Sequence, residues 1–199
     1  MFTLCIGTIF EAVMENSNQH PKVFAALGDS ITWGYPYGKS WTQLVENALG
    51  ISILNHGLNG DILEGMLSRL SDIITKDEAH TIIVMGGTND IYSGFTTQEM
   101  IKTSQEIEKE IQAAGRCIIW GIPVPIADAQ IDAELEIYRE WLRKTGQPII
   151  PFDTAFYENS ILKTGLLPDT VHPSETGYIK MAQVAEEALK KINHSLGIY

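Results

Sequence analysis

Short apolar runs alternate with longer amphipathic segments along most of the chain. The short runs are typical of buried strands, and they lie at Val23–Leu27, Ile51–Leu54, Ile82–Met85, Cys117–Trp120 and Pro148–Pro151. The longer segments repeat apolar residues at helical spacing, and they predict helices at Trp41–Leu49, Ile62–Ile74, Thr97–Ala114, Ile131–Leu142 and Tyr178–Ile192. This repeated order of strand and helix predicts an α/β fold, in which helices cover both faces of a central parallel five-stranded sheet.

The N-terminal segment follows a different pattern, because apolar residues recur at alternate positions within Phe2–Phe10, as in a strand. We expect residues 1–21 to form an apolar arm packed on the domain or on a partner subunit, and residues 22–199 to form one domain. No Lys or Arg precedes Lys22, and Glu11 interrupts the apolar run, so the segment lacks the features of a secretion signal. We therefore expect a cytoplasmic protein.

Composition narrows the classes of partner. The 199 residues include 25 Asp and Glu against 14 Lys and Arg, which gives a formal net charge of −11. Such a charge disfavours nucleic acid and anionic membrane surfaces as partners. Two cysteines provide neither a disulfide framework nor zinc-ligand spacing, and no apolar run is long enough to span a membrane. A small-molecule substrate fits this profile, and the apolar arm makes a homodimer an alternative to a monomer.

Chemically useful side chains follow the predicted strands. Gly28–Ser30 comes after the first strand, Asn55–Asp61 after the second, Gly87–Asp90 after the third, and Asp169–His172 precedes the last helix. Parallel sheets bind their ligands at the carboxyl ends of the strands, so we expect these segments to converge. A serine, an Asp-His pair, backbone donors and a side-chain amide suffice for acyl transfer through a serine nucleophile.

Each residue type has a role in that chemistry. The Ser30 hydroxyl is a weak nucleophile unless an imidazole takes its proton, and His172 has Asp169 three residues upstream to orient its ring. The oxyanion of the tetrahedral intermediate needs hydrogen-bond donors, which the backbone N–H groups of Ser30 and Gly60 and the amide of Asn89 can supply. This mechanism requires no metal and no organic cofactor.

These segments together resemble the SGNH, or GDSL, hydrolases, a family of lipase, esterase and lysophospholipase-type acylhydrolases named for Ser, Gly, Asn and His. Ser30, Gly60 and Asn89 match the first three sequence blocks in order, and Asp169–His172 matches the last. The resemblance extends from about Val23 to the C-terminus. It implies a flavodoxin-like three-layer α/β/α sandwich and a serine esterase.

Further residues near these blocks have predicted roles. Trp33, Tyr35 and Tyr37 follow the nucleophile, and Ile122 and Pro123 follow the fourth strand. Either set could line a substrate site, since ligand pockets favour apolar and aromatic walls, and packing within the fold is the alternative.

Three more residues receive structural assignments. Asp29 and Asp90 adjoin the blocks, and we expect their carboxylates to accept backbone N–H bonds that hold the loops. Cys117 begins an apolar strand, so we expect it in the core rather than in chemistry.

The sequence favours a carboxylic-ester hydrolase that forms an acyl-Ser30 intermediate. The elements between Asn89 and Asp169 leave little chain for a lid, which predicts an open site, short acyl chains and small soluble esters. A carbohydrate O-acetylesterase, a lysophospholipase and a thioesterase are alternatives within the same family.

Two other classes are weaker. A metal-dependent hydrolase could draw ligands from Asp29, Asp61, Asp90, Asp169 and His172, but it leaves Ser30 without a role. A non-catalytic carbohydrate- or lipid-binding relative does not explain why all the blocks are intact.

Overall fold

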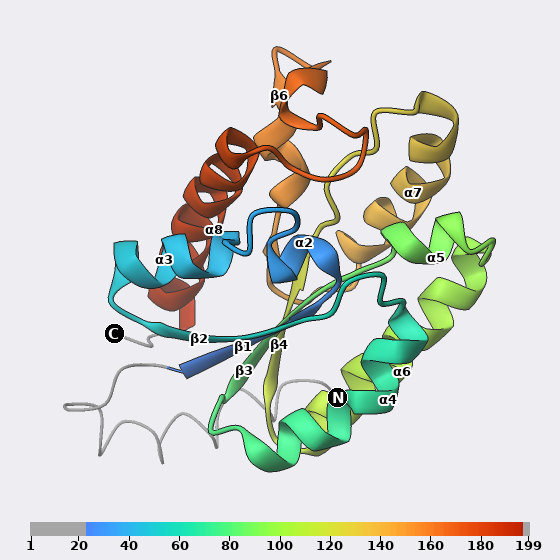
Figure 1. Ribbon diagram of the computed structural model, residues 1–199. Helices are drawn as coiled ribbons and strands as arrows, with labels where there is room; N and C mark the ends of the chain where they lie inside the picture. Colours follow the sequence, from blue (N-terminus) through green and yellow to red (C-terminus); the bar gives the residue numbers. More distant parts are fainter. Residues whose placement is uncertain (1–22, 197–199) are drawn as a thin grey trace.

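A computed structural model describes residues 23–196 of the chain, and the predicted arm at residues 1–21 lies outside them. Its centre is a five-stranded parallel sheet with the order β2-β1-β3-β4-β5 (Figure 1). The strands are β1 (Val23–Gly28), β2 (Ser52–Gly57), β3 (Thr81–Met85), β4 (Cys117–Gly121) and β5 (Ile149–Ile150). Helices lie on both faces, which confirms the predicted α/β three-layer sandwich.

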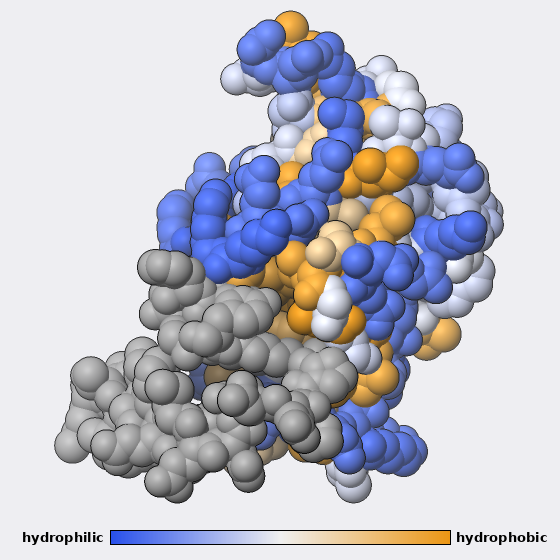
Figure 2. Space-filling model, turned by 90° about the vertical axis from the view of Figure 1, so that its left-hand side faces the viewer, coloured by the Kyte–Doolittle hydropathy of each residue, from blue (hydrophilic) through white to orange (hydrophobic). Residues whose placement is uncertain are grey.

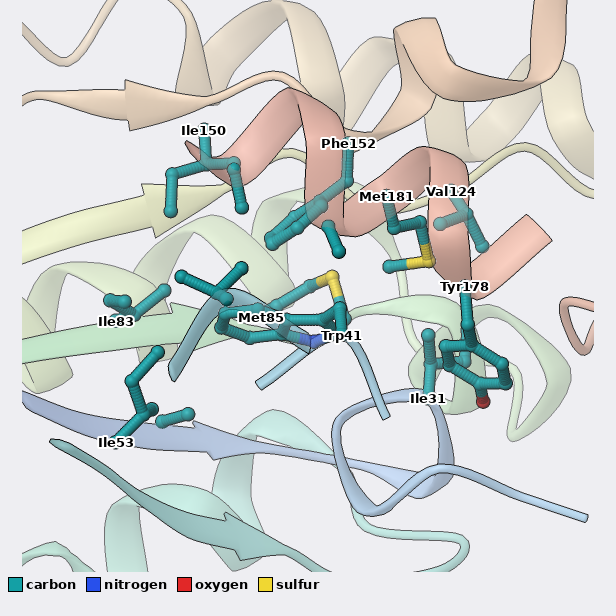
Figure 3. Close-up of a cluster of buried hydrophobic side chains, with 14 of the residues drawn as sticks. Ile31, Trp41, Ile53, Ile83, Met85, Val124, Ile150, Phe152, Tyr178 and Met181 are labelled. Atoms are coloured by element: carbon teal, nitrogen blue, oxygen red, sulfur yellow. The ribbon is translucent and has the colours of Figure 1, made fainter. Parts of the chain in front are cut away.

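Two helices cover one face of the sheet, α3 (Trp41–Leu49) and α8 (Glu175–Leu196). Their apolar sides meet the sheet in the cluster drawn in Figure 3, where the indole of Trp41 lies 4.8 Å from the Phe152 ring between their centroids. Met181 of α8 lies in the same cluster. Burying side chains of this size stabilises the fold by about 1.5–3 kcal/mol each.

The other face is covered by α4 (Leu63–Lys76), α6 (Thr97–Ala113) and α7 (Ala129–Leu142). Along β1 the side chains alternate between the two cores, because successive residues of a strand point to opposite faces. Phe24 and Ala26 face α3 and α8, whereas Ala25 and Leu27 face α4. Both faces of the strand are buried, which explains its nearly continuous apolar sequence.

Several short elements lie beyond the sheet and were absent from the sequence-based prediction. They are α2 (Ser30–Trp33), α5 (Thr88–Tyr92), β6 (Tyr157–Glu158), β7 (Ile161–Leu162) and the 3-10 helices η1 (Phe152–Phe156) and η2 (Thr164–Leu166). Such pieces span too few residues for a hydrophobic period to register.

The antiparallel hairpin of β6 and β7 stands out at the top of Figure 1. In the chain, the hairpin lies between β5 and the Asp169–His172 turn. The segment from Asn89 to Asp169 therefore contains more than the strands and helices that the sequence predicted there. The prediction that Cys117 lies in the core is wrong. Cys117 is the first residue of β4, and it is exposed.

Within the described part of the chain, no helix is both long and apolar enough to cross a membrane. Figure 2 turns the left-hand side of Figure 1 toward the reader and shows hydrophobic residues gathered near the middle of the described surface, beside hydrophilic ones. Leu49, Ile51 and Ile192 are only partly buried where they pack against the α3–α8 core.

Candidate active site

The carboxyl edge of the sheet brings the predicted blocks together. Gly28, the last residue of β1, pairs in register with Gly57 of β2 and with Met85 of β3. The segments that leave these strands therefore start at one level, and they carry Ser30, Gly60 and Asn89 to the same edge of the sheet.

Ser30 is the first residue of α2. Only Asp29 separates it from the end of β1, so Ser30 lies at the carboxyl edge of the sheet. Asp29 caps α2, because its Oδ1 accepts a hydrogen bond from the Ile31 N–H at 2.9 Å. A side chain at Gly28 would put its Cβ 2.1 Å from the Thr32 Oγ1, so the turn requires glycine there. The Ser30 residue is only 6% exposed, yet its hydroxyl reaches an imidazole across the edge.

Ser30, His172 and Asp169 form a continuous hydrogen-bonded line. The Ser30 Oγ lies 2.9 Å from the His172 Nε2, and the His172 Nδ1 lies 2.7 Å from the Asp169 Oδ2. Asp169 Oδ1 accepts hydrogen bonds from the backbone N–H groups of His172 at 2.7 Å and Val171 at 3.1 Å. Partial burial raises the pKa of Asp169, but these hydrogen bonds outweigh it and hold the pKa below its ordinary value.

The turn that presents Asp169 and His172 is unusual at Thr170, whose φ is 76°. A β-branched residue in this left-handed region is strained, and surrounding contacts must hold it. The Thr170 carbonyl accepts from the Ala127 N–H at 2.8 Å, and the Thr170 N–H donates to the Leu167 carbonyl at 3.0 Å. The turn is thus tied to the segment that follows β4.

The oxyanion donors predicted from the sequence lie around this edge. Gly60 has a φ of 76°, and a Cβ built on it would meet no atom within 4 Å, so its backbone borders open space. Asn89 is the second residue of α5, and its Nδ2 donates to the Asp61 carbonyl at 2.9 Å. One N–H of that amide is engaged with the protein, which leaves the other for a ligand.

Asp29 and Asp90 carry buried carboxylates beneath the edge. Asp90 accepts from the Leu63 N–H at 3.1 Å and 3.3 Å, and Asp29 accepts from the backbone of α2. These bonds confirm their predicted loop-holding contacts. Burial raises the pKa of each group to about 6, although backbone hydrogen bonds oppose the shift, as does the nearby His172 in the case of Asp29.

The aromatic residues after Ser30 are largely exposed: Trp33, Tyr35 and Tyr37 each present between 41% and 42% of their surface to solvent. The Tyr35 ring also lies 4.6 Å from the His172 imidazole between centroids. The three aromatic rings are available to a ligand beside the hydrogen-bonded line of Ser30, His172 and Asp169.

Ile122 and Pro123 are in a different position. Ile122 is fully buried in the core between the sheet and α4, α6 and α7, and Pro123 is buried beside it. The burial of both residues favours packing within the fold, the alternative to a substrate wall after β4. The apolar run there continues the core beyond the end of the strand.

The sequence patterns assigned no role to two residues that hold or border the candidate site, Asn55 and Tyr92. Asn55 donates through Nδ2 to the Thr32 carbonyl at 2.7 Å and accepts the Gly57 N–H at 2.8 Å, so it ties α2 to the end of β2. Tyr92, at the end of α5, is 49% exposed and its hydroxyl interacts with the Thr170 side chain. An aromatic residue three positions after Asn89 was the available signal for it.

The residues proposed for a metal site have other partners. Among the side chains that the structure describes, those of residues 23–192, no three His, Cys, Asp or Glu are grouped so that they could hold a metal ion. His56, the remaining histidine of these segments, pairs with Asp77 at 2.6 Å. The metal-dependent alternative therefore gains no support from the arrangement of these side chains.

Comparison with known protein families gives one match. The model of the GDSL-like lipase/acylhydrolase family matches residues 26–179. No curated protein sequence matches the chain significantly.

Solved structures provide a further comparison. A lipolytic protein of the G-D-S-L family from Desulfitobacterium hafniense superposes with a TM-score of 0.76 at 20% identity, covering 84% of this chain and 99% of the other. A member of the same family from Veillonella parvula gives a TM-score of 0.71 at 25% identity, covering 86% and 100%. An acetylxylan esterase from Geobacillus stearothermophilus gives 0.73 at 20% identity, covering 84% and 94%.

Proposed function

The chain belongs to the GDSL-like lipase/acylhydrolase family and is an ester-bond hydrolase, and from this premise we propose that it cleaves carboxylic esters through an acyl-Ser30 intermediate. The observation that carries the proposal is the line from Ser30 Oγ to His172 Nε2 and from His172 Nδ1 to Asp169. Such a line activates a serine hydroxyl and keeps the imidazole in the required tautomer.

In the first half of the reaction, Ser30 Oγ attacks the ester carbonyl carbon and its proton passes to His172 Nε2. The carbonyl oxygen becomes an oxyanion, which accepts hydrogen bonds from the Ser30 and Gly60 N–H groups and from the free N–H of Asn89. Asp169 stabilises the imidazolium that forms. The bond to the alcohol oxygen then breaks, and the leaving alkoxide takes the proton from His172.

In the second half, a water molecule replaces the alcohol. His172 removes a proton from the water, whose oxygen attacks the acyl carbon and forms a second oxyanion in the same place. The bond to Ser30 Oγ breaks and the serine regains its proton from His172, which releases a carboxylic acid. The two half-reactions return the enzyme to its starting state with one ester hydrolysed by one water.

We place small, neutral, short-chain esters first among substrates. The net charge of −11 repels anionic substrates, and a short acyl group needs no deep cavity beside Ser30. Acetylated carbohydrates are the second candidate. The exposed rings of Trp33, Tyr35 and Tyr37 favour them, since flat aromatic faces pack well against sugar rings, and the fold resembles that of an acetylxylan esterase.

The test compares wild type and Ser30→Ala on a panel of p-nitrophenyl esters from acetate to palmitate, and on acetylated xylo-oligosaccharides. We expect Ser30→Ala to lower kcat by at least about 10³-fold on every substrate, and kcat/KM to fall as the acyl chain lengthens. A fluorophosphonate probe should label wild type and not the variant. Wild-type activity in Ser30→Ala would contradict the proposal.

Matched arms of the panel separate the two substrate classes. Trp33→Ala and Tyr37→Ala should raise KM for acetylated oligosaccharides more than for p-nitrophenyl acetate if sugars are bound. Equal effects on both substrates would favour simple esters.

A further inference from the structure

The oxyanion hole proposed above depends on three segments that are not neighbours in the sequence. Its donors come from the start of α2, from the loop after β2 and from α5. Oxyanion donors act only when they lie within hydrogen-bond distance of the developing charge. Something must therefore fix these segments relative to one another.

Asp61 joins two of them. It follows Gly60 directly, its backbone N–H donates to the Leu58 carbonyl at 3.1 Å, and its own carbonyl accepts the Asn89 Nδ2 at 2.9 Å. Asp61 therefore sets the direction of the Asn89 amide while its backbone fixes the position of Gly60. The side chain of Asp61 is 7% exposed, so it has little freedom to move.

Arg69 of α4 joins Asp61 to the third segment. Its Nε donates to the Asp61 Oδ2 at 2.8 Å, and its Nη2 donates to the Gly28 carbonyl at 3.0 Å. Gly28 lies two residues before the nucleophile and also accepts from the Leu58 N–H at 3.0 Å. One guanidinium thus links the end of β1 to the oxyanion loop.

The helix backbone supports this link from below. A Cβ at Gly65 would lie 1.9 Å from the Asp61 Oδ1, so the carboxylate rests directly against α4 where no side chain intervenes. The planar guanidinium matches the two acceptors in a way that a lysine ammonium cannot, because it presents separate N–H donors in a fixed fork.

We propose that Arg69 is a positioning residue for catalysis: through Asp61 and the Gly28 carbonyl, it holds the Gly60 and Asn89 donors in register with Ser30. Arg69 does not touch the substrate in this proposal. The inference rests on the proposed function. It predicts that the loss of Arg69 reduces the stabilisation of the transition state and leaves substrate binding nearly unchanged.

The test is a double-mutant cycle of Arg69→Gln and Asn89→Ala in the full chain, with kcat measured on p-nitrophenyl acetate. We expect Arg69→Gln to lower kcat about tenfold and to change KM less than about twofold, a smaller loss than removal of a donor itself. In an Asn89→Ala background the same substitution should lower kcat at most about threefold, because only the Gly60 donor is left to be displaced.

A second readout separates positioning from general stability. A trifluoromethyl ketone adds to the serine and leaves an oxyanion in the same place, so its Ki should rise about tenfold in Arg69→Gln, in step with kcat/KM. Arg116→Gln is the matched control, since Arg116 also donates to backbone carbonyls, those of Ile74, Asp77 and Ala79, away from the triad. It should lower the Tm and leave kcat unchanged.

Each outcome decides the proposal. A tenfold loss in both backgrounds, or an unchanged kcat and Ki in Arg69→Gln, overturns it. If Arg69→Gln does not fold, Arg69→Lys takes its place, and full activity in that variant overturns the proposal equally. Ser30→Ala is assayed alongside: without Ser30-dependent hydrolysis both proposals fail, whereas Ser30-dependent hydrolysis with an additive cycle rejects the role of Arg69 alone.

Discussion

Single side chains at the carboxyl edge of the sheet combine a proposed part in the reaction with hydrogen bonds to the local backbone. Asp169 orients His172 and also accepts two backbone N–H bonds from the turn, so one carboxylate shapes both the imidazole and the loop that bears it. Beneath it, Asp29 and Asp90 hold neighbouring segments while lying in the interior, where burial disfavours their charged forms. The chemistry and the folding of this edge therefore share residues.

Asp169→Asn tests the orienting role. The amide is the same size and its oxygen can still accept the backbone bonds, but it no longer stabilises an imidazolium. We expect kcat for p-nitrophenyl acetate to fall by about 10³–10⁴-fold with little change in Tm. Asp128→Asn, at the cap of α7, is the control and should keep full activity. A loss of less than tenfold in Asp169→Asn would argue against the triad.

Asp90→Asn tests the cost of the buried charge. Burial raises the pKa of Asp90 in the folded state to about 6, above the ordinary aspartate value of 3.8, so the folded state binds the proton more tightly than the unfolded state. The stability of wild type relative to the variant is thus fully present below pH 4 and is lost as the pH rises through 6. Urea unfolding measures the free energy of unfolding of both proteins at pH 4 and at pH 7. Between these two pH values, the stability of the variant relative to wild type should rise by on the order of 2 kcal/mol. A difference that does not change with pH would refute the shift.

At the scale of elements, short elements carry residues that we propose for catalysis, and the long helices and strands form the frame. The helices that pack on the sheet follow the apolar periodicity closely, and the predicted helix at Trp41–Leu49 has those limits in the structure. The pieces that hold Ser30 and Asn89 are α2 and α5, which span 4 and 5 residues. Their geometry comes from caps and turns against neighbouring strands rather than from an internal pattern.

The β6–β7 hairpin gives a prediction at this scale. Its turn residues Asn159 and Ser160 have φ values of 51° and 63°, a left-handed pair that suits Asn-Gly turns. Ser160→Gly should therefore raise the free energy of unfolding by about 0.5–1 kcal/mol. Ser93→Gly, at a φ of −85°, is the control and should lower it. Thermal unfolding of the pair provides the measurement, and equal shifts would contradict this explanation.

At the scale of the whole molecule, strand order arranges the segments around the proposed site, and the net charge bears on which substrates approach it. The order β2-β1-β3-β4-β5 places β1 between β2 and β3, so the segments after these strands flank Ser30 from both sides. The negative net charge acts over a longer range than any contact at the edge, although salt screens it within about 8–10 Å.

That charge predicts a salt effect that depends on the substrate. For acetyl esters of matched size, kcat/KM for one with an anionic leaving group should rise as NaCl increases from low to physiological concentration. A neutral ester should change by less than about twofold, since screening removes only the repulsion of like charges. Identical salt profiles would show that the net charge has no part in selecting substrates.

The sequence by itself determined the alternation of strands and helices and the residue types at the strand ends. Both are local properties, because the hydrophobic period and the turn residues depend on short stretches of sequence. Only the tertiary structure decided which of these residues meet. It joined Ser30 to His172 across 142 positions and kept Ile122 inside the core rather than in a wall of the site. It also linked Arg69 to Gly28, since contacts between distant segments follow from strand order and packing, which no local pattern encodes.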